Sequence, residues 1–503
     1  MPNFSVGRGG LNGAWGVWGA GRVRAARAGL LIAAGALMPL GVIAFATIAS
    51  AAHGAMMSAA QPGGGGNAAM PEVVKSLDLA AAIAEARSES RLLLLELAPG
   101  TTRNAAISER WSSPILKAWA KRHALVVRVS DMATLKLLQE QGLTQASDGD
   151  PLLFKDGKYV RAFSIAANWS TQNDENNQPV RVYASKQLSR IPRAPRGTAS
   201  DIALMLRLDW TWRSFETSDP AFFAAHVKGV EERAKGVKPD EASFRMKEED
   251  GIKPMLISVP MGEAGEKAII DALTQVRAFS ASEKPEDLAK ATGGYTSIWE
   301  LTDVAGSNFD SARLCIIAAE MHALASRYAP AKARFRAMFE AEMTQVDTAD
   351  AKRLFSVLTL ARIADVHVPV LEFVDNALND PDAATMMPRA ERLNLESMLP
   401  RLHFNDPLSE TKRPISILER HAKVITGKPP RSIPAEAAAK AVEFRRWLML
   451  VDAGRVCATL RVAGGRDEDV KAARALTEKT LGESAAVKRT LELADMLAPQ
   501  TKK

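Results

Sequence analysis

The chain has 503 residues, of which 47% are apolar and 24% are charged, and its formal net charge is +7. A chain of this length exceeds what one compact core supports, so two or three domains are expected. The apolar content excludes a chain that is disordered throughout. The modest positive charge favours contact with anionic surfaces only weakly and indicates no particular partner.

The amino-terminal segment predicts a membrane helix. Residues 28–52 carry no charge and are rich in Leu, Ile, Ala and Gly. At about 1.5 Å per residue, this run is long enough to cross a bilayer core of about 30 Å. Arginines precede it and no acidic residue occurs before Glu72. The positive-inside rule therefore keeps residues 1–27 in the cytoplasm and places the bulk of the protein outside it, anchored by a single span.

A cleaved signal peptide is the alternative for the same segment. Ala49-Ser50-Ala51 offers a small-residue cleavage pattern, and cleavage would give a secreted or periplasmic protein. The apolar run exceeds the roughly 7 to 15 residues of a signal core, which favours the uncleaved anchor. A mitochondrial presequence fits less well, because it should be amphipathic rather than uniformly apolar. Residues 53–72 contain a run of four glycines and predict a flexible linker.

Residues 73–123 alternate between helical and strand-like patterns. Residues 79–86 predict a helix that Asp78 caps, and residues 92–97 form an apolar run of strand length. The run breaks at residues 98–100, which include Pro99 and Gly100. Four apolar residues then recur at helical spacing, with an interruption at Ser113-Pro114 that predicts a kink or two short helices: Ile107, Trp111, Ile115 and Trp119.

A second strand and a hairpin follow. Residues 124–129 predict a strand, and residues 132–138 predict a helix that ends near Gly142. Asp156-Gly157 lies between two apolar runs and is a strong hairpin signal. An amphipathic helix is then expected from Ser200-Asp201, with its apolar face formed by Ile202, Leu206 and Trp210.

This order of elements resembles the thioredoxin-like family, and residues 150–160 are the most similar part because they match the family's cis-proline strand, turn and strand. The resemblance implies an α/β domain over residues 73–216, with a central mixed sheet flanked by helices. The helix from Ser200 would be its closing helix, after a long insertion. It also implies that the bond before Pro151 is cis and that the backbone preceding Pro151 faces the active-site loop.

The chain departs from the family at that loop. Where the family carries Trp-Cys-x-x-Cys, this sequence reads Gly100-Thr101-Thr102-Arg103-Asn104. Thiol exchange requires a thiolate and a second sulfur, and threonine supplies neither. Thr101 as a hydrolytic nucleophile would need a base, and the nearest histidine in sequence is His123. A helix-capping role for Thr101 or Thr102 is simpler. No catalytic residue, cofactor or metal ligand is predicted.

What the resemblance leaves is a binding surface. Redox-active relatives hold extended peptides against the backbone before the proline through main-chain hydrogen bonds. The resemblance therefore implies a protein or peptide partner. The alternative is a scaffold whose ancestral site is filled or covered. The residues at the loop and proline positions are Thr101, Thr102, Arg103, Asn104, Asp150 and Pro151.

Residues 167–198 form a basic insertion. Residues 170–179 are polar and predict a surface loop. Residues 181–196 contain no acidic residue and predict either contact with anionic lipid headgroups or another acidic polymer, or a solvated loop. Nucleic-acid binding is disfavoured because the only aromatic residue there is Tyr183. The basic residues are Arg181, Lys186, Arg190, Arg193 and Arg196.

Residues 217–503 are dominated by helical periodicity. Apolar stripes run along residues 314–328 and 444–451. Breaks are expected at Pro330, Pro381, Pro429-Pro430 and Gly464-Gly465. Segments 456–463, 467–482 and 485–497 loosely resemble the helix pairs of tetratricopeptide-type repeats. No motif recurs at a fixed period, so a mainly α-helical domain is predicted, with a solenoid as one arrangement.

Candidate chemistry in the helical half is sparse. His322 follows Glu320 but no second histidine completes a metal pattern, and Asp303 and Asp310 are two of many acidic residues. Three further histidines are isolated, and surface or satisfied core positions are expected for all of them: His367, His403 and His421.

The two cysteines, Cys315 and Cys457, are expected to be buried free thiols, although an oxidising compartment would permit a bridge. Two other functions stay open. One is an enzyme whose site lies in the helical half or at its junction with the first domain. The other is thiol chemistry through a partner or through Cys315. The sequence does not indicate an oligomeric state.

Overall fold

A computed structural model gives the architecture of the chain. The predicted membrane segment at 28–52 and nearly all of the linker lie outside the described residues. The structure describes residues 72–97, 101–140, 152–155, 158–162, 169–173, 179–183, 198–235, 252–257, 263–367, 374, 388–402, 415–429, 433–463 and 466–498.

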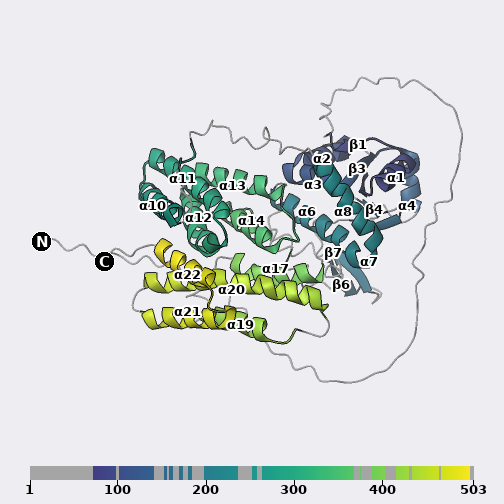
Figure 1. Ribbon diagram of the computed structural model, residues 1–503. Helices are drawn as coiled ribbons and strands as arrows, with labels where there is room; N and C mark the ends of the chain where they lie inside the picture. Colours follow the sequence, from purple (N-terminus) through teal and green to yellow (C-terminus); the bar gives the residue numbers. More distant parts are fainter. Residues whose placement is uncertain are drawn as a thin grey trace. The chain divides into compact units, whose positions relative to one another are not determined.

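A five-stranded mixed sheet organises the amino-terminal part (Figure 1). Its strands are β1 (Val74–Lys75), β2 (Leu92–Leu97), β3 (Ala124–Val129), β4 (Leu152–Lys155) and β5 (Lys158–Ala162). The order across the sheet is β1-β3-β2-β4-β5. β1, β3 and β2 are parallel, whereas β4 runs antiparallel to β2 and β5 antiparallel to β4. The predicted mixed sheet is therefore confirmed, and so is the hairpin of β4 and β5.

Helices cover both faces of this sheet. Leu93 and Leu95 pack with helices α1 (Leu79–Ser88) and α4 (Met132–Glu140). Leu92 and Leu94 belong to the larger cluster, which includes α2 (Thr101–Ser112), α3 (Pro114–His123) and α6 (Thr198–Arg213). Burial on both faces explains why β2 is a continuous apolar run rather than an alternating one.

Two local predictions in this part are confirmed. Asp78 caps α1 by accepting a hydrogen bond from the Ala81 amide at 2.8 Å. The Ser113-Pro114 interruption separates α2 from α3, because proline suits the first turn of a helix but not its interior.

The prediction that the helix from Ser200 is amphipathic was wrong. Every residue of α6 from 202 to 212 is buried, including Arg207, Asp209 and Thr211. Two helices follow, α7 (Phe215–Ser218) and α8 (Pro220–Ala234). Because α6 is enclosed on all sides, its polar side chains must find partners inside the protein.

The expectation of a loop throughout residues 170–179 was also wrong. Strands β6 (Trp169–Asn173) and β7 (Pro179–Tyr183) pair as an antiparallel two-stranded sheet. Pro179 is the first residue of β7, a position where the missing amide hydrogen is tolerated. The composition suggested a loop because Asn, Gln, Ser and Asp are uncommon in strands.

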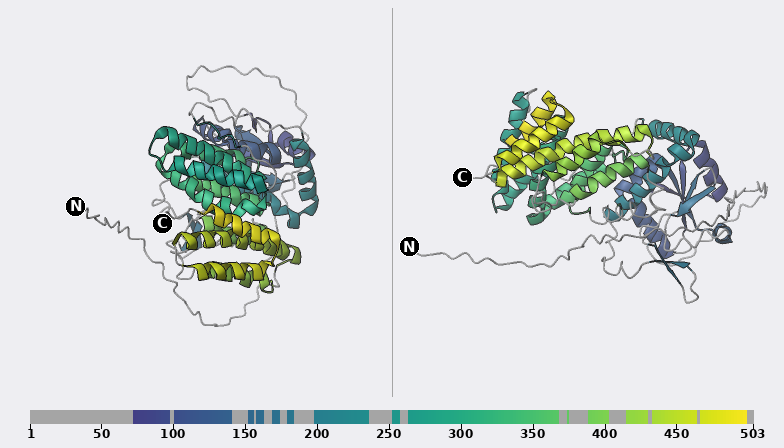
Figure 2. Two further views of the ribbon diagram at one scale, coloured as in Figure 1. Left: turned by 60° about the vertical axis from the view of Figure 1, so that its left-hand side comes forward. Right: turned by 90° about the horizontal axis from the view of Figure 1, so that it is seen from below.

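The carboxyl-terminal part is helical, as predicted (Figures 1 and 2). Its elements are α10 (Glu263–Ser280), α11 (Pro285–Val304), η4 (Ser307–Phe309), the π-helix η5 (Ala312–Ile317), α12 (Ala318–Arg327), α13 (Ala329–Met343), α14 (Ala351–Ile363), α17 (Arg389–Leu402), α19 (Ser416–Thr426), α20 (Ala435–Ala463), α21 (Asp467–Leu481) and α22 (Ala485–Leu497).

The long helix α20 is the main correction in this half. Residues 456–463, taken as the start of a helix pair, form the end of a helix of 29 residues. α20 packs against α17, α19, α21 and α22. Gly454 permits the close approach of η5, because a Cβ atom there would lie 1.8 Å from the Ser311 hydroxyl. The apolar residues of the predicted stripes at 314–328 and 444–451 are buried, except for Tyr328, which is partly buried.

The predicted domain boundary between residues 216 and 217 stays a prediction. One buried cluster contains residues from both sides of it, such as Trp119 and Phe335. Within the described part of the chain, which starts at Glu72, no helix has both the length and the apolar composition to cross a bilayer.

Candidate functional site

Only four of the six binding residues predicted from the thioredoxin resemblance lie within the described residues. Thr101, Thr102, Arg103 and Asn104 form the first turn of α2, just after β2. Asp150 and Pro151 lie outside the described residues. β4 begins directly after them and runs antiparallel to β2, with Leu152 opposite Leu95. The chain therefore leaves β2 and enters β4 at the same edge of the sheet.

The predicted basic residues are only partly within the described chain. Arg181 occupies β7, opposite Thr171 of β6. The others lie outside the described residues: Lys186, Arg190, Arg193 and Arg196.

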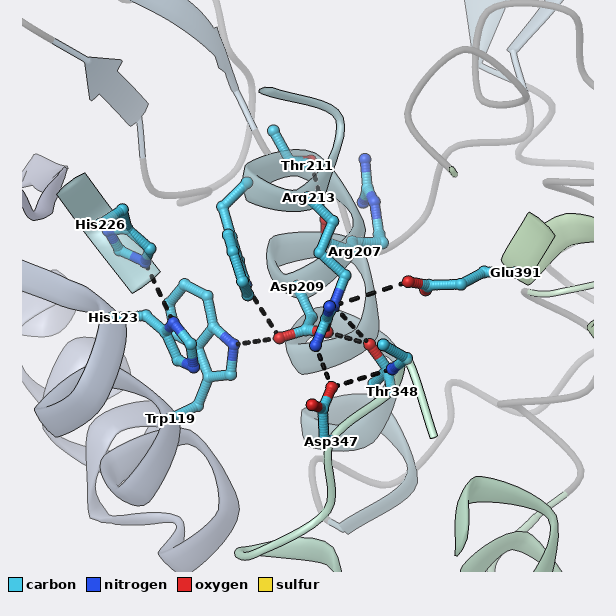
Figure 3. A network of polar contacts seen from close by, with 12 residues as sticks. Trp119, His123, Arg207, Asp209, Thr211, Arg213, His226, Asp347, Thr348 and Glu391 are labelled. Carbon is cyan, nitrogen blue, oxygen red and sulfur yellow. Dashed lines mark hydrogen bonds and ion pairs between the residues drawn. The ribbon is translucent and has the colours of Figure 1, made fainter. Parts of the chain in front are cut away.

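The most constrained group of polar side chains was not predicted. It is centred on Asp209, which is 4% exposed and lies on α6 (Figure 3). The indole nitrogens of Trp119 and Trp212 donate hydrogen bonds to Asp209 at 3.2 and 2.9 Å. Arg213 donates its Nε–H at 2.9 Å, and the Thr348 hydroxyl donates as well. Four donors from three parts of the chain therefore converge on one carboxylate.

Arg213 balances the charge of Asp209 and also meets two other carboxyl groups. It forms an ion pair with Asp347, and its Nε lies 3.6 Å from Oε1 of Glu391 on α17. Its guanidinium also lies 4.7 Å from the centre of the Trp212 ring. Burial acts to lower the pKa of Arg213, but Asp209, Glu391 and Asp347 outweigh burial and raise it. The guanidinium therefore remains charged.

The carboxyl groups of Asp209 and Glu391 differ sharply in acidity. Burial acts to raise the pKa of Asp209, but Arg213 and the hydrogen bonds lower it to about 2. Burial raises the pKa of Glu391 to about 8, and Arg213 offsets this only in part because Asp209 and Asp347 repel a second negative charge. At neutral pH Asp209 is ionised and Glu391 is mainly protonated.

Two buried histidines form the other side of the cluster. Nδ1 of His226 lies 2.7 Å from the Ser90 carbonyl oxygen, so it must carry a hydrogen and donate it. Nε2 of neutral His226 is then the acceptor for Nδ1–H of His123 at 3.1 Å. Trp119 and Trp212 stack on His123 with ring centres 5.0 and 5.1 Å away.

The aromatic surroundings keep both imidazoles neutral. Burial lowers the pKa of His226 to about 4, and Arg233 adds to this effect while the Ser90 hydrogen bond opposes it. Burial also lowers the pKa of His123 well below its usual value, although the charge of Asp209 acts in the opposite direction. Protonation of either ring would place a charge where water is excluded.

The sequence carried only a weak signal for this cluster. Asp209 and Arg213 lie four residues apart in a largely apolar part of the helix, a spacing that permits an ion pair. A charged pair inside a helix buried on all sides implies further partners. Two of those partners are far from Asp209 in the sequence: Trp119 lies 90 positions away and Thr348 lies 139 positions away. No local pattern reveals such distances.

The other candidate residues of the helical half have structural partners. His421 lies 2.8 Å from Asp452 with both side chains buried, and His367 contacts Arg362 at 3.1 Å. Asp303 pairs with Arg313 and Arg353, and Asp310 accepts a hydrogen bond from Trp447. The expectation of satisfied core positions is thus confirmed for His367 and His421. His403 lies outside the described residues, and His322 is half-buried.

The two cysteines do not form a disulfide. Cys457 is buried, as predicted, whereas Cys315 is only partly buried and its thiol donates a hydrogen bond to the Val451 carbonyl oxygen. Within the described ranges, no three His, Cys, Asp or Glu side chains come together in a geometry that could hold a metal ion.

Comparison of the chain with protein families, curated proteins and solved structures gives no match.

We predict that Asp209→Asn destabilises the protein by about 3 kcal/mol, because it leaves the buried Arg213 cation without its buried, ionised counter-ion. The free energy of unfolding from urea titrations at pH 7 measures this loss. Asp347→Asn is the matched control: the Asp347 side chain is 64% exposed, so a cost below about 1 kcal/mol is expected. Equal losses in the two variants would show that the buried carboxylate is not the dominant partner.

A second prediction concerns acid stability. His226 has a lower pKa in the folded protein than in the unfolded chain, so its contribution is complete above pH 6.5 and is lost as the pH falls towards about 4. His226→Phe keeps an aromatic ring in the stack and removes the titrating group. From pH 6.5 to 4, the stability of this variant relative to wild type should rise by up to about 3 kcal/mol.

Urea unfolding at several pH values measures this difference. The comparison must be with wild type at each pH, because Glu391 acts in the opposite direction over part of the same range. A difference that does not change with pH would mean that His226 is not held neutral by the fold.

Proposed function

We propose that this chain is a thioredoxin-like protein without dithiol redox activity, which binds a protein or peptide at the sheet edge where β2 ends and β4 begins. We further propose that residues 28–52 tether it to a membrane and that the bulk of the chain lies outside the cytoplasm. Residues 217–503 would form a second, mainly α-helical domain with a supporting role, with a solenoid as one arrangement.

The observation that carries this proposal is the topology of the sheet. The order β1-β3-β2-β4-β5, with β4 antiparallel to the other four strands, forms a central mixed sheet of the kind that the resemblance to thioredoxin-like proteins implies. α2 starts directly beyond β2, and β4 enters at the same edge. This is where redox-active relatives hold extended peptides, as the resemblance implies.

The missing sulfur supports binding over electron transfer. The first turn of α2 holds Thr101 and Asn104 at the positions of the two family cysteines. Without a thiolate and a resolving thiol, no mixed disulfide can form and be released there. The same observation is compatible with a scaffold whose ancestral site has no ligand, and the crosslinking experiment below separates the two.

The proposed location follows from the sequence. The uncharged run at 28–52 and the arginines before it support a single span with residues 1–27 in the cytoplasm, or a signal peptide that is removed. In the tethered form, the basic residues from Arg181 to Arg196 would be near the bilayer and could contact anionic headgroups. A solvated loop is the alternative for that segment.

A second candidate function is an enzyme at the junction of the sheet and the helical part. The specific observation in its favour is the pair of Asp209 and Glu391, which contact one guanidinium and have pKa values near 2 and 8. Carboxyl groups of such unequal acidity serve as acid and base in several enzymes. Here, however, the four donors that surround Asp209 come from the protein itself, which favours a structural role.

The test of binding is photocrosslinking from position 102. A photoreactive residue at Thr102 of the full-length chain, in membranes of the source cells, should yield a discrete crosslinked protein that mass spectrometry identifies. Lys136, whose side chain is 76% exposed on α4, is the matched control position and should not yield the same product. A product pattern at Thr102 identical to that at Lys136 would favour the scaffold.

The absence of redox activity is tested by insulin reduction. The wild-type chain should show no turnover above background, because the first turn of α2 contains no sulfur. The double variant Thr101→Cys, Asn104→Cys places two thiols one helical turn apart, a spacing suited to a disulfide. Turnover is expected to appear in this variant. Wild-type turnover comparable to that of a dithiol protein would overturn the proposal.

A further inference from the structure

In the cluster around α6, the buried guanidinium of Arg213 contacts three carboxyl groups. Arg213 contacts Asp209, which precedes it by one turn, Asp347 from the connection between α13 and α14, and Glu391 from α17 (Figure 3). If all three carboxyl groups were ionised, Arg213 could offset only one of the three charges. A second buried cation, Arg122, acts on Asp209 and Asp347, but it is not among the main influences on Glu391. A site with little access to water disfavours this state, so at least one carboxyl group must hold a proton or gain other partners.

The contacts identify Glu391 as the carboxyl group that holds the proton. Asp209 accepts four hydrogen bonds, which stabilise its charge. Asp347 is largely exposed, so water stabilises its charge. Glu391 is 9% exposed, its Oε1 lies beyond hydrogen-bond distance of Arg213, and its Oε2 has no hydrogen-bond partner among the described residues. Its ionised form therefore has the least compensation of the three.

We propose that the contact of Glu391 with Arg213 makes the docking of α17 on α6 depend on a proton. The docked state of α17 is stable while the Glu391 carboxyl group is protonated, and it becomes less stable as the pH rises. This inference is independent of whether the sheet edge binds a peptide. It assigns to the cluster a regulatory role that a purely structural ion pair would not have.

The charges that act on Glu391 come from three neighbouring elements. Arg213 and Asp209 belong to α6, Glu216 to α7 and Asp347 to the connection between α13 and α14. Of these four charges, only that of Arg213 favours the ionised form of Glu391. α17 also packs on α14 and α20, where its buried residues Leu395 and Met398 join the apolar core. Neither of those helices supplies any of the largest electrostatic influences on Glu391 within the described chain.

The direction of the pH dependence follows from proton linkage. The pKa of Glu391 is about 8 when α17 is docked, and it should return towards the ordinary value of 4.5 when α17 opens to solvent. Between these two values the docked state binds more protons than the open state. The opening constant of α17 should therefore rise by up to about tenfold per pH unit across this window and level off above about pH 8.

Hydrogen–deuterium exchange of the full-length chain tests this. Exchange of the amides of residues 389–402, corrected for the intrinsic rate at each pH, should accelerate from pH 5 to pH 8 and stay constant from pH 8 to pH 9.5. Glu391→Gln removes the titrating proton with little change of shape and should abolish the pH dependence of the corrected rate. Glu396→Gln, an exposed position on the same helix, should keep the wild-type profile.

Two results would overturn the proposal. One is a corrected exchange rate of α17 in wild type that does not change between pH 5 and pH 8. The other is a profile for Glu391→Gln that matches wild type. If Glu391→Gln fails to fold, Asp347→Asn replaces it. This variant removes one negative charge near Glu391, so the plateau of the corrected exchange rate should begin at a lower pH. A plateau that begins at the wild-type pH would equally refute the proposal.

Discussion

The structure depends on the burial of one ionised carboxylate. Asp209 lies on a helix that is enclosed on all sides, where an unpaired charge would cost several kcal/mol. Its charge is tolerated because two indoles, a guanidinium and a hydroxyl donate to it. These donors come from α3, from α6 and from the segment between α13 and α14. One charge therefore fixes how the sheet-containing part and the first helices of the carboxyl-terminal part pack together.

Burial and this charge together decide the ionisation of Glu391. Burial disfavours a charge on Glu391, and the negative Asp209 adds repulsion, so Glu391 keeps its proton. Burial and the aromatic stack hold His123 and His226 neutral on the other side. The cluster thus contains one acid that is ionised and one that is not, together with two neutral bases. This pattern resembles that of an active site, yet the protein's own donors surround the ionised carboxylate, so we favour structure and regulation over catalysis.

The proposed binding surface and the cluster around Asp209 lie in different places along the sheet-containing part. The surface comprises the end of β2, the start of α2 and the start of β4, whereas the cluster belongs to α6 and its neighbours. A partner at the sheet edge would be held mainly through the backbone, because the residues that replace the family cysteines provide no covalent chemistry.

The sequence alone determined the elements whose causes are local. Apolar runs gave β2 and β3, Asp78 gave the start of α1, Pro114 gave the break between α2 and α3, and Asp156-Gly157 gave the hairpin. Tertiary structure decided what depends on burial by distant residues. α6 was predicted to be amphipathic, but its polar residues are buried, and Asp209 receives hydrogen bonds from Trp119 and Thr348, which lie far away in the sequence. Hydrogen bonds between residues 90 or more positions apart leave no periodic signal, so only the folded chain could reveal the Asp209 cluster.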